Sequence, residues 1–178
     1  IFQNPLNTWQ GNSLILGMFE EDIYTQLEKS NLKIEAKSLT NKLLEKDFKG
    51  KKGQILTLEI LDSHINSLII IGLGKRNKID YEYLSNSIAD CARRICDKDK
   101  KSGIFLPWIE LENLSIYSVA EIVQLSIFRD NRFNHKRDER VALKEIEFLG
   151  IDHLKDISFK EVQDICAGVE FARELVAA

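Results

Sequence analysis

The sequence is poor in proline and glycine, with 2 Pro and 9 Gly among its 178 residues. That scarcity excludes collagen-like and low-complexity chains and argues against a turn-dense β-sandwich. A surplus of one charge is missing too, since 25 Lys and Arg stand against 28 Asp and Glu, a net charge of −3. A dedicated nucleic-acid-binding domain would be strongly basic, so we do not expect that class of protein.

Long hydrophobic runs are also lacking. The longest, Leu68–Ile71, is far shorter than the roughly 20 residues that a membrane-spanning helix needs. The first residues, Ile1–Trp9, lack the basic start and apolar core of a signal peptide, so we expect a cytoplasmic protein. The three cysteines, Cys91, Cys96 and Cys166, form no C-x-x-C pair and are predicted to be small buried side chains in a reducing compartment.

What is present is the pattern of one globular domain, because 44% of the residues are hydrophobic and 30% are charged. Apolar runs predict strands, and stripes at helical spacing predict helices between them. The strands are expected at Ser13–Phe19, Gln54–Ile60, Ser67–Ile71, Gly103–Leu106 and Lys144–Leu149, and the helices at Glu21–Ser30, Leu32–Glu45, Tyr81–Ile95, Ile116–Ile127 and from Ser158 onward. This alternation predicts an α/β fold, a three-layer α/β/α arrangement whose mixed, mostly parallel sheet is covered by helices on both faces. Ser67–Ile71 is expected inside the sheet, not at its edge.

The last predicted helix has the clearest start signal. Ser158 and Glu161 form an S-x-x-E capping box, in which each side chain accepts a hydrogen bond from a free backbone N–H group. An apolar stripe follows: Val162, Ile165, Cys166, Val169, Ala172 and Val176. Neither Gly, Asn nor Pro ends the helix, and the chain does not begin with Met, so we expect that the natural polypeptide is longer at both ends.

One glycine pair could hold a phosphate. Gly72 and Gly74 follow an apolar run, but Asn77 stands where a dinucleotide-binding motif has its third glycine. A P-loop would need Ser or Thr after Lys75, and Arg76 stands there. We therefore predict that Gly72–Lys75 is a structural turn that binds no phosphate, and a phosphate site is the alternative.

Basic residues cluster twice. The first cluster is Lys42, Lys46, Lys49, Lys51 and Lys52, and the second is the loop Arg129–Arg140, where Phe128 and Phe133 alternate with the basic residues. Aromatic residues in such a loop can stack on bases, yet mixed charge usually marks a solvated surface, which is the interpretation we prefer.

The three histidines, His64, His135 and His153, are isolated in the sequence and form no metal-binding pair. No G-x-S-x-G motif occurs. We therefore predict no catalytic, metal-binding or cofactor-binding residue in residues 1–178.

Three segments, in this order, resemble the N-terminal domain of the leucyl aminopeptidase family. Phe48-x-Gly50-Lys51-x-Gly53-Gln54 is similar to the family's F-x-G-K-x-G-Q turn, and Leu68–Lys75 is similar to its strand ending in V-G-L-G-K. Residues 167–176, Ala-Gly-x-x-x-Ala-Arg-x-Leu-Val, resemble the helix that leads into the catalytic domain. The segment Ser126–Asp130 departs from the family pattern.

The resemblance implies a parent cytosolic aminopeptidase that releases N-terminal amino acids, often leucine, with two divalent metals, zinc or manganese, to activate water. It places every catalytic residue and metal ligand in a C-terminal domain that would begin after residue 178. It also implies a macro-domain-like fold and a hexamer with the N-terminal domains outside. This chain would then be an accessory and assembly domain whose partner is its own catalytic domain, and we expect neither DNA nor a membrane as a partner. The alternative is a stand-alone macro-like module that binds ADP-ribose or another nucleotide.

Overall fold

The computed structural model describes residues 9–21, 23, 25, 36–60, 65–95, 101–108, 111, 114–128, 143–151 and 158–176. Along these residues strands and helices alternate: β1 (Ser13–Phe19), α2 (Ala36–Glu45), β2 (Ile55–Glu59), β3 (Ser67–Gly74), the short 3-10 helix η1 (Arg76–Lys78), α3 (Tyr81–Ile95), β4 (Lys101–Phe105), α4 (Ile116–Ile127), β5 (Glu145–Leu149) and α5 (Lys160–Val176).

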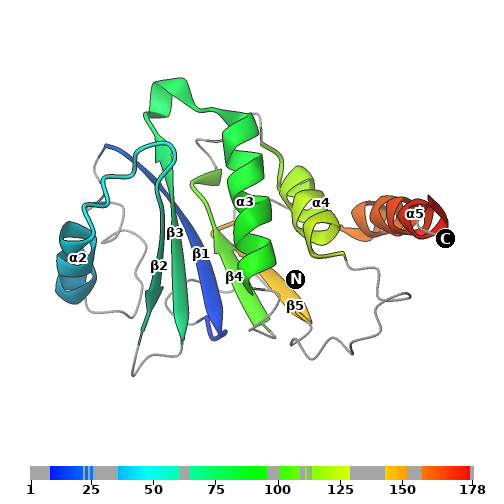
Figure 1. Cartoon of the computed structure of the whole chain (residues 1–178), viewed down its shortest axis with the longest axis horizontal. Helices are drawn as coiled ribbons and strands as arrows, with labels where there is room; N and C mark the ends of the chain where they lie inside the picture. The colour runs from blue at the N-terminus through cyan, green and yellow to red at the C-terminus, as the bar shows by residue number, and fades with distance from the viewer. Residues whose placement is uncertain are drawn as a thin grey trace.

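The five strands form one mixed sheet in the order β2-β3-β1-β4-β5 (Figure 1). β1 pairs in parallel with both β3 and β4, and β4 pairs in parallel with β5. β2 is antiparallel to β3 and forms one edge. The sheet is therefore mixed and mostly parallel, and β3 lies inside it, as the sequence predicts.

The central strand β1 is buried along its whole length because its side chains point alternately to two covered faces. Ile15 and Phe19 face a hydrophobic cluster that includes Ile88 of α3 and Val119 of α4. On the other face, Leu14, Leu16 and Met18 pack with Leu39 and Leu43 of α2. Helices thus cover both faces, which confirms the predicted α/β fold.

The predicted boundaries differ most at β3. The apolar pattern predicts a strand that ends at Ile71 and a turn at Gly72–Lys75, but β3 continues to Gly74. The predicted turn is therefore wrong. β4 begins at Lys101, two residues before the predicted start, and β1 has the predicted bounds. The predicted helix Glu21–Ser30 lies mostly outside the described residues.

A buried carboxylate joins the start of the described chain to the far edge of the sheet. Glu147 of β5 has no exposed surface, and its Oε2 accepts a hydrogen bond of 2.6 Å from Nε1 of Trp9. Its Oε1 accepts a second bond of 2.7 Å from Nζ of Lys101 on β4. A buried charge of this kind is tolerated only when it is paired and hydrogen-bonded, as it is here.

Candidate functional site

The first candidate region is the loop 48–54, which crosses the end of β3. Its geometry depends on Gln54, whose Oε1 accepts hydrogen bonds from the backbone N–H groups of Lys49 and Lys51 at 2.8 and 3.0 Å. The Nε2 of Gln54 donates to the backbone carbonyl of Asp47 at 3.0 Å. One side chain therefore closes the loop on itself, and Phe48 anchors it in the core with 7% of its surface exposed.

Glycine is required where this loop meets the sheet. A Cβ atom at Gly72 would lie 2.2 Å from the carbonyl oxygen of Lys51, closer than nonbonded atoms approach. The loop takes the place of a further strand partner, because the N–H of Gly72 donates to the Gln54 carbonyl at 2.8 Å and the N–H of Gly74 to the Gly50 carbonyl at 2.9 Å. β3 extends through Gly74, beyond the end that the apolar pattern predicts, because Gly72 and Gly74 pair with Met18 and Phe19 of β1 on one side and with this loop on the other.

The same bonds decide what the glycine pair can bind. A phosphate-binding loop presents free backbone N–H groups to an anion. The N–H groups of Gly72 and Gly74 already donate to carbonyls of the loop, so neither faces a ligand. That the chain binds no phosphate there stays a prediction, and it now has a geometric reason.

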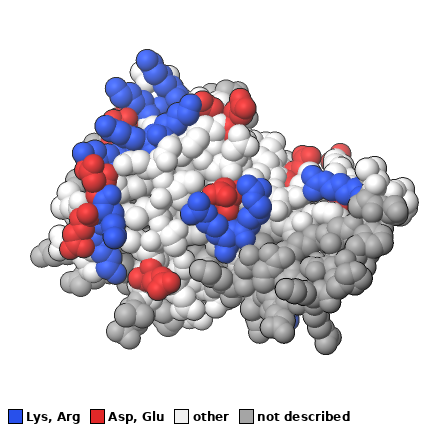
Figure 2. Space-filling model, viewed as in Figure 1, with Lys and Arg blue, Asp and Glu red and all other residues white. Residues whose placement is uncertain are grey.

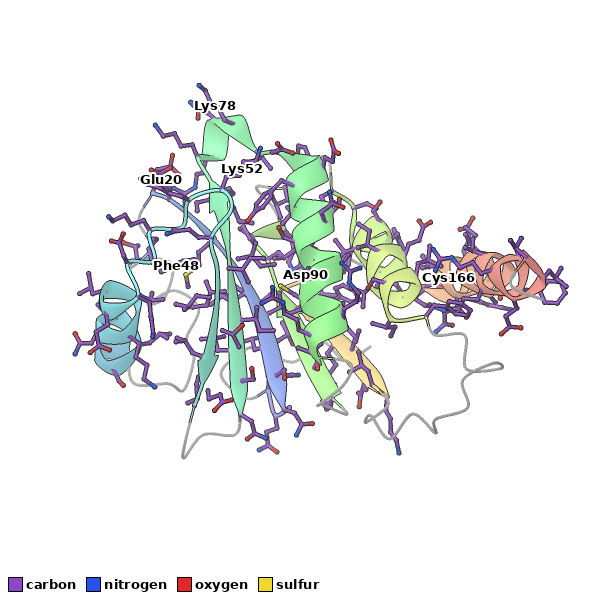
Figure 3. All side chains as sticks on the ribbon, in the orientation of Figure 1. Glu20, Phe48, Lys52, Lys78, Asp90 and Cys166 are labelled. Carbon is purple, nitrogen blue, oxygen red and sulfur yellow. The ribbon has the colours of Figure 1, made fainter. Side chains whose placement is uncertain are left out.

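The lysines of the first basic cluster that belong to this loop have acidic neighbours. Nζ of Lys49 lies 2.7 Å from a carboxylate oxygen of Asp47. Lys52 pairs with Asp80, whose other carboxylate oxygen caps α3 by accepting a hydrogen bond from the N–H of Tyr83 at 2.9 Å. The hydrogen bond from Lys52 holds the pKa of Asp80 below its ordinary value. Lys and Arg side chains gather over this end of the molecule, near η1, where Lys52 and Lys78 lie (Figures 2 and 3).

The described residues contain no candidate metal site. Within that part of the chain no group of three or more His, Cys, Asp or Glu side chains is placed to hold a metal ion. A pair of divalent metals needs several converging carboxylates, so the described residues do not fit such a site. His64, His135 and His153 lie outside the described residues, as does the basic loop Arg129–Arg140. The prediction that the chain holds no metal therefore stays a prediction.

The described cysteines are buried and unpaired with each other, as expected. Burial raises the pKa of the Cys91 thiol to about 12 and also raises the pKa of Cys166. Both thiols are therefore protonated at neutral pH and are poor nucleophiles. Cys96 lies outside the described residues.

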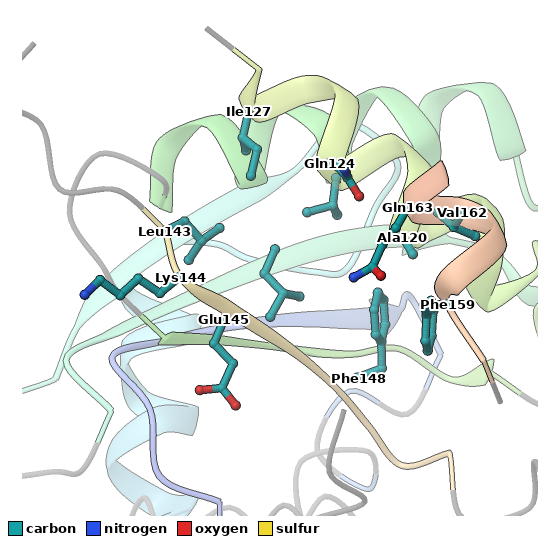
Figure 4. Close-up of a pocket in the computed structure, with 12 residues that line it drawn as sticks. Ala120, Gln124, Ile127, Leu143, Lys144, Glu145, Phe148, Phe159, Val162 and Gln163 are labelled. Atoms are coloured by element: carbon teal, nitrogen blue, oxygen red, sulfur yellow. The ribbon is translucent and has the colours of Figure 1, made fainter. Parts of the chain in front are cut away.

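A cavity of about 590 Å³ lies between α4, β5 and the start of α5 (Figure 4). Phe148 of β5 and Phe159 stack against each other at its wall, with ring centroids 5.4 Å apart. Its lining is mainly apolar, and among the described residues that line it Glu145 is the one carboxylate. The described residues that line this cavity include no nucleophile with an adjacent base, so we assign no reaction to it.

The last helix, α5, is the part of the structure that sequence reasoning described least well. The predicted stripe is only partly buried: Val162 and Cys166 face the core, but Ile165 is 50% exposed and Val176 is 90% exposed. α5 begins at Lys160, and the N–H of Gln163 donates a hydrogen bond to the Phe159 carbonyl. The cap position is therefore Phe159, one residue after the predicted cap at Ser158. Phe159 is buried, and its ring stacks on that of Phe148.

Arg173, in the last turns of α5, belongs to the family-like segment 167–176, but the sequence does not predict its contacts. Its Nη1 donates a hydrogen bond of 2.9 Å to the backbone carbonyl of Leu125 on α4, and its guanidinium lies 5.7 Å from the centre of the Phe128 ring. A cation at a helix C-terminus is favourable because the last carbonyls have no partner within the helix. Arg173 therefore ties α5 to the end of α4.

These observations define an α/β domain with a mixed sheet between helices and with one outer helix, α5, held at its far end by an arginine. Residues 15–137 match the family model described as the N-terminal domain of the cytosol aminopeptidase family. The chain belongs to that family, and it corresponds to the N-terminal domain of its members.

Curated relatives match nearly the whole chain. A probable cytosol aminopeptidase from Prochlorococcus marinus (strain MIT 9215) is 48% identical over 178 residues, which are 99% of this chain and 36% of that protein. One from Synechococcus sp. (strain CC9311) is 32% identical over 176 residues, 96% of this chain and 34% of that protein. The chain thus spans about a third of the length of these relatives.

Solved structures show the same fold at lower identity. A mutant tomato leucine aminopeptidase has a TM-score of 0.73 at 23% identity and covers 99% of this chain, which corresponds to 37% of that structure. The bottromycin maturation enzyme BotP has a TM-score of 0.57 at 13% identity and covers 94% of this chain and 33% of its own. In the described residues, no helix is both long enough and apolar enough to cross a membrane.

Proposed function

We propose that this chain is the non-catalytic N-terminal domain of a metal-dependent cytosolic aminopeptidase that releases N-terminal amino acids, often leucine, from peptides. The observation that carries the proposal is the extent of the match: relatives named as aminopeptidases align with 99% of this chain through only 36% of their own length. The reaction then belongs to the remaining two-thirds of those proteins. Among the described residues, no cluster of metal-ligating side chains competes with that assignment.

The role of the domain in this proposal is accessory. It would hold its own catalytic domain, beginning after residue 178, and contribute to contacts between subunits of a hexamer in the cytoplasm. The two divalent metals, zinc or manganese, would sit in the catalytic domain, since the described residues here offer no fitting ligand set. Peptide substrate would reach the domain only through the parent enzyme.

The alternative, a stand-alone module that binds ADP-ribose or another nucleotide, is not favoured. Such a module needs free N–H groups for a diphosphate, and those of Gly72 and Gly74 are engaged by the loop 48–54.

Two proteins test the proposal. The 178-residue chain is assayed with leucine-p-nitroanilide and added zinc, manganese or magnesium, and we expect no turnover above buffer. A chimera joins this chain to the remaining part of the Prochlorococcus marinus (strain MIT 9215) relative, and we expect metal-dependent hydrolysis that a chelator abolishes. Chelator-sensitive turnover by the chain alone, or an inactive but folded chimera, would contradict the proposal.

A further inference from the structure

One side of α5 carries exposed apolar residues, of which Ile165 also borders the groove between α5 and α4. We call this side the outer face of α5 and define it as Ile165, Gly168, Phe171, Ala172, Leu175 and Val176, all of which are exposed. At about 100° of rotation per residue, these six positions fall within a sector of roughly 140°. Between positions 165 and 176, the charged residues Glu170, Arg173 and Glu174 lie outside that sector.

The exposure is large for apolar side chains. Phe171 is 62% exposed, Leu175 is 60% exposed and Val176 is 90% exposed. Single exposed apolar residues are ordinary, but a contiguous apolar patch on one helix face usually marks a surface that another element covers. The outer face is such a patch, and it lies at one end of the molecule, where α5 extends beyond the sheet (Figure 1).

Three contacts fix the direction in which this face points. Val162 and Cys166 are buried, and both lie outside the sector of the outer face. Near the other end of the helix, Arg173 donates its hydrogen bond to the Leu125 carbonyl and lies over the Phe128 ring. Because α5 is held at both ends, it cannot rotate to bury the outer face without breaking these contacts.

The face also has the shape that helix packing requires. Gly168 and Ala172 are four residues apart, so they are neighbours on one side of the helix and form a shallow groove between larger side chains. A Cβ atom at Gly168 would meet nothing within 4 Å, so the space above the groove is open. Small residues in such a row let a second element approach the helix backbone closely.

We propose that the outer face of α5 is the docking surface for the polypeptide that follows this region in the longer relatives, and that an apolar segment of that polypeptide packs along the groove at Gly168 and Ala172. The inference rests on the proposed function and names its partner and contact surface. Its basis is that a relative matches 99% of this chain through 36% of its own length, and that the matching family model describes an N-terminal domain. A segment joined covalently to α5 reaches this face at high effective concentration.

A second copy of this chain fits the face less well. The outer face spans twelve residues, so it is about 18 Å long and about 10 Å wide. A stable interface between separate chains buries roughly 800 Å² per partner, which is much more than this face offers. A contact within one polypeptide needs less area, because two covalently linked segments lose less translational and rotational entropy on contact than two separate chains do.

The chimera described above provides the test, with Leu175→Glu and Phe171→Glu as the disrupting variants. The matched control is Leu44→Glu on α2, because Leu44 is 61% exposed and the substitution is the same. We expect the unmodified chimera and the Leu44→Glu chimera to unfold in one cooperative transition. In the two outer-face variants the N-terminal domain should unfold separately, and proteolysis near residue 178 should be about tenfold faster.

Gly168→Leu distinguishes docking from a loss of folding. In the 178-residue chain this change should raise the melting temperature, because leucine favours a helix more than glycine does. In the chimera it should weaken the coupling between the domains, because the new side chain fills the groove. If Gly168→Leu stabilises the 178-residue chain but weakens the coupling between the domains of the chimera, a misfolded α5 cannot explain both effects.

The outcomes separate this inference from the proposed function. An inactive but folded chimera contradicts the proposed function whatever the variants do. An active chimera in which Leu175→Glu, Phe171→Glu and Gly168→Leu behave like Leu44→Glu overturns the docking inference alone. Dimerisation of the 178-residue chain in sedimentation experiments, abolished by Leu175→Glu, would assign the face to a second copy and would also overturn it.

Discussion

At several positions of this domain, close contacts in the fold determine which amino acid is tolerated, and these contacts cannot be inferred from composition. Gln54 closes the loop 48–54 with three hydrogen bonds, and Gly72 leaves room for that loop to lie on β3. The F-x-G-K-x-G-Q and G-L-G-K motifs are separate in the sequence, but here they are the two sides of one contact. Their residue types are therefore explained by packing, without a bound ligand.

Gly72→Ala should destabilise the domain, by about 2 kcal/mol, because its Cβ would meet the Lys51 carbonyl at 2.2 Å and backbone atoms cannot move aside easily. Gly168→Ala is the matched control. Its Cβ would meet no atom within 4 Å, and alanine favours a helix, so stability should rise by about 1 kcal/mol. Urea unfolding of the two variants gives both values, and equal effects of the same sign would contradict this view of Gly72.

A second prediction at this scale concerns Lys101 and alkaline pH. The hydrogen bond to Glu147 raises the pKa of Lys101 above its ordinary value of 10.5. Because the folded pKa is the higher one, the pair contributes its full stability below about pH 10.5 and loses that contribution as the pH rises through the folded pKa.

Lys101→Met should therefore cost about 3 kcal/mol at pH 7, because it leaves the buried Glu147 carboxylate without its cation. The difference between this variant and the unmodified chain should shrink as the pH rises above 10.5. Urea midpoints at pH 7, 9 and 11 measure it. A difference that stays constant over that range would show that the ion pair does not contribute as proposed.

At the scale of elements, Arg173 is the polar tie between α5 and α4. Arg173→Ala removes its hydrogen bond to the Leu125 carbonyl and its contact with Phe128, and we expect a loss of about 1 kcal/mol. Amide hydrogen exchange should accelerate in residues 170–176 and stay unchanged in α3. Arg173→Lys should recover only part of the protection, since an ammonium lacks the planar group that both donates and stacks.

The elements that the sequence predicted well are those with two covered faces or one clear stripe. β1 is apolar throughout and has the predicted bounds, and the α3 stripe at Leu84, Ile88, Cys91 and Ile95 is buried as expected. The end of β3 differs from the prediction because Gly72 and Gly74 interrupt the apolar run, although they pair with β1 and with the loop 48–54. The outer face of α5 was missed because one helix carries two apolar sectors, and periodicity alone does not say which of them is buried.

At the scale of the whole molecule, the loop 48–54 covers a place where α/β folds of this kind often bind a ligand. In open α/β sheets, ligands usually bind beyond the carboxyl ends of the parallel strands, where neighbouring connections diverge. Here the ends of β1 and β3 meet the loop: a Cβ atom at Gly50 would lie 2.6 Å from the Phe19 carbonyl oxygen, and the Gly74 N–H donates to the Gly50 carbonyl. The loop 48–54 therefore occupies the space beyond the carboxyl ends of β1 and β3.

We therefore expect the 178-residue chain to give no saturable heat when titrated with ADP-ribose, ATP or NAD. The backbone N–H groups of Gly72 and Gly74, which could otherwise donate to a diphosphate, already donate hydrogen bonds to the loop 48–54. Gln54→Ala tests the reason as well as the result, because it removes the three hydrogen bonds that close the loop and so exposes these groups more often. Weak nucleotide binding that appears only in this variant would agree with the view that the loop 48–54 covers the N–H groups of Gly72 and Gly74. Binding below millimolar concentrations by the unmodified chain, lost in Gly74→Ala, would contradict it and favour the nucleotide-binding alternative.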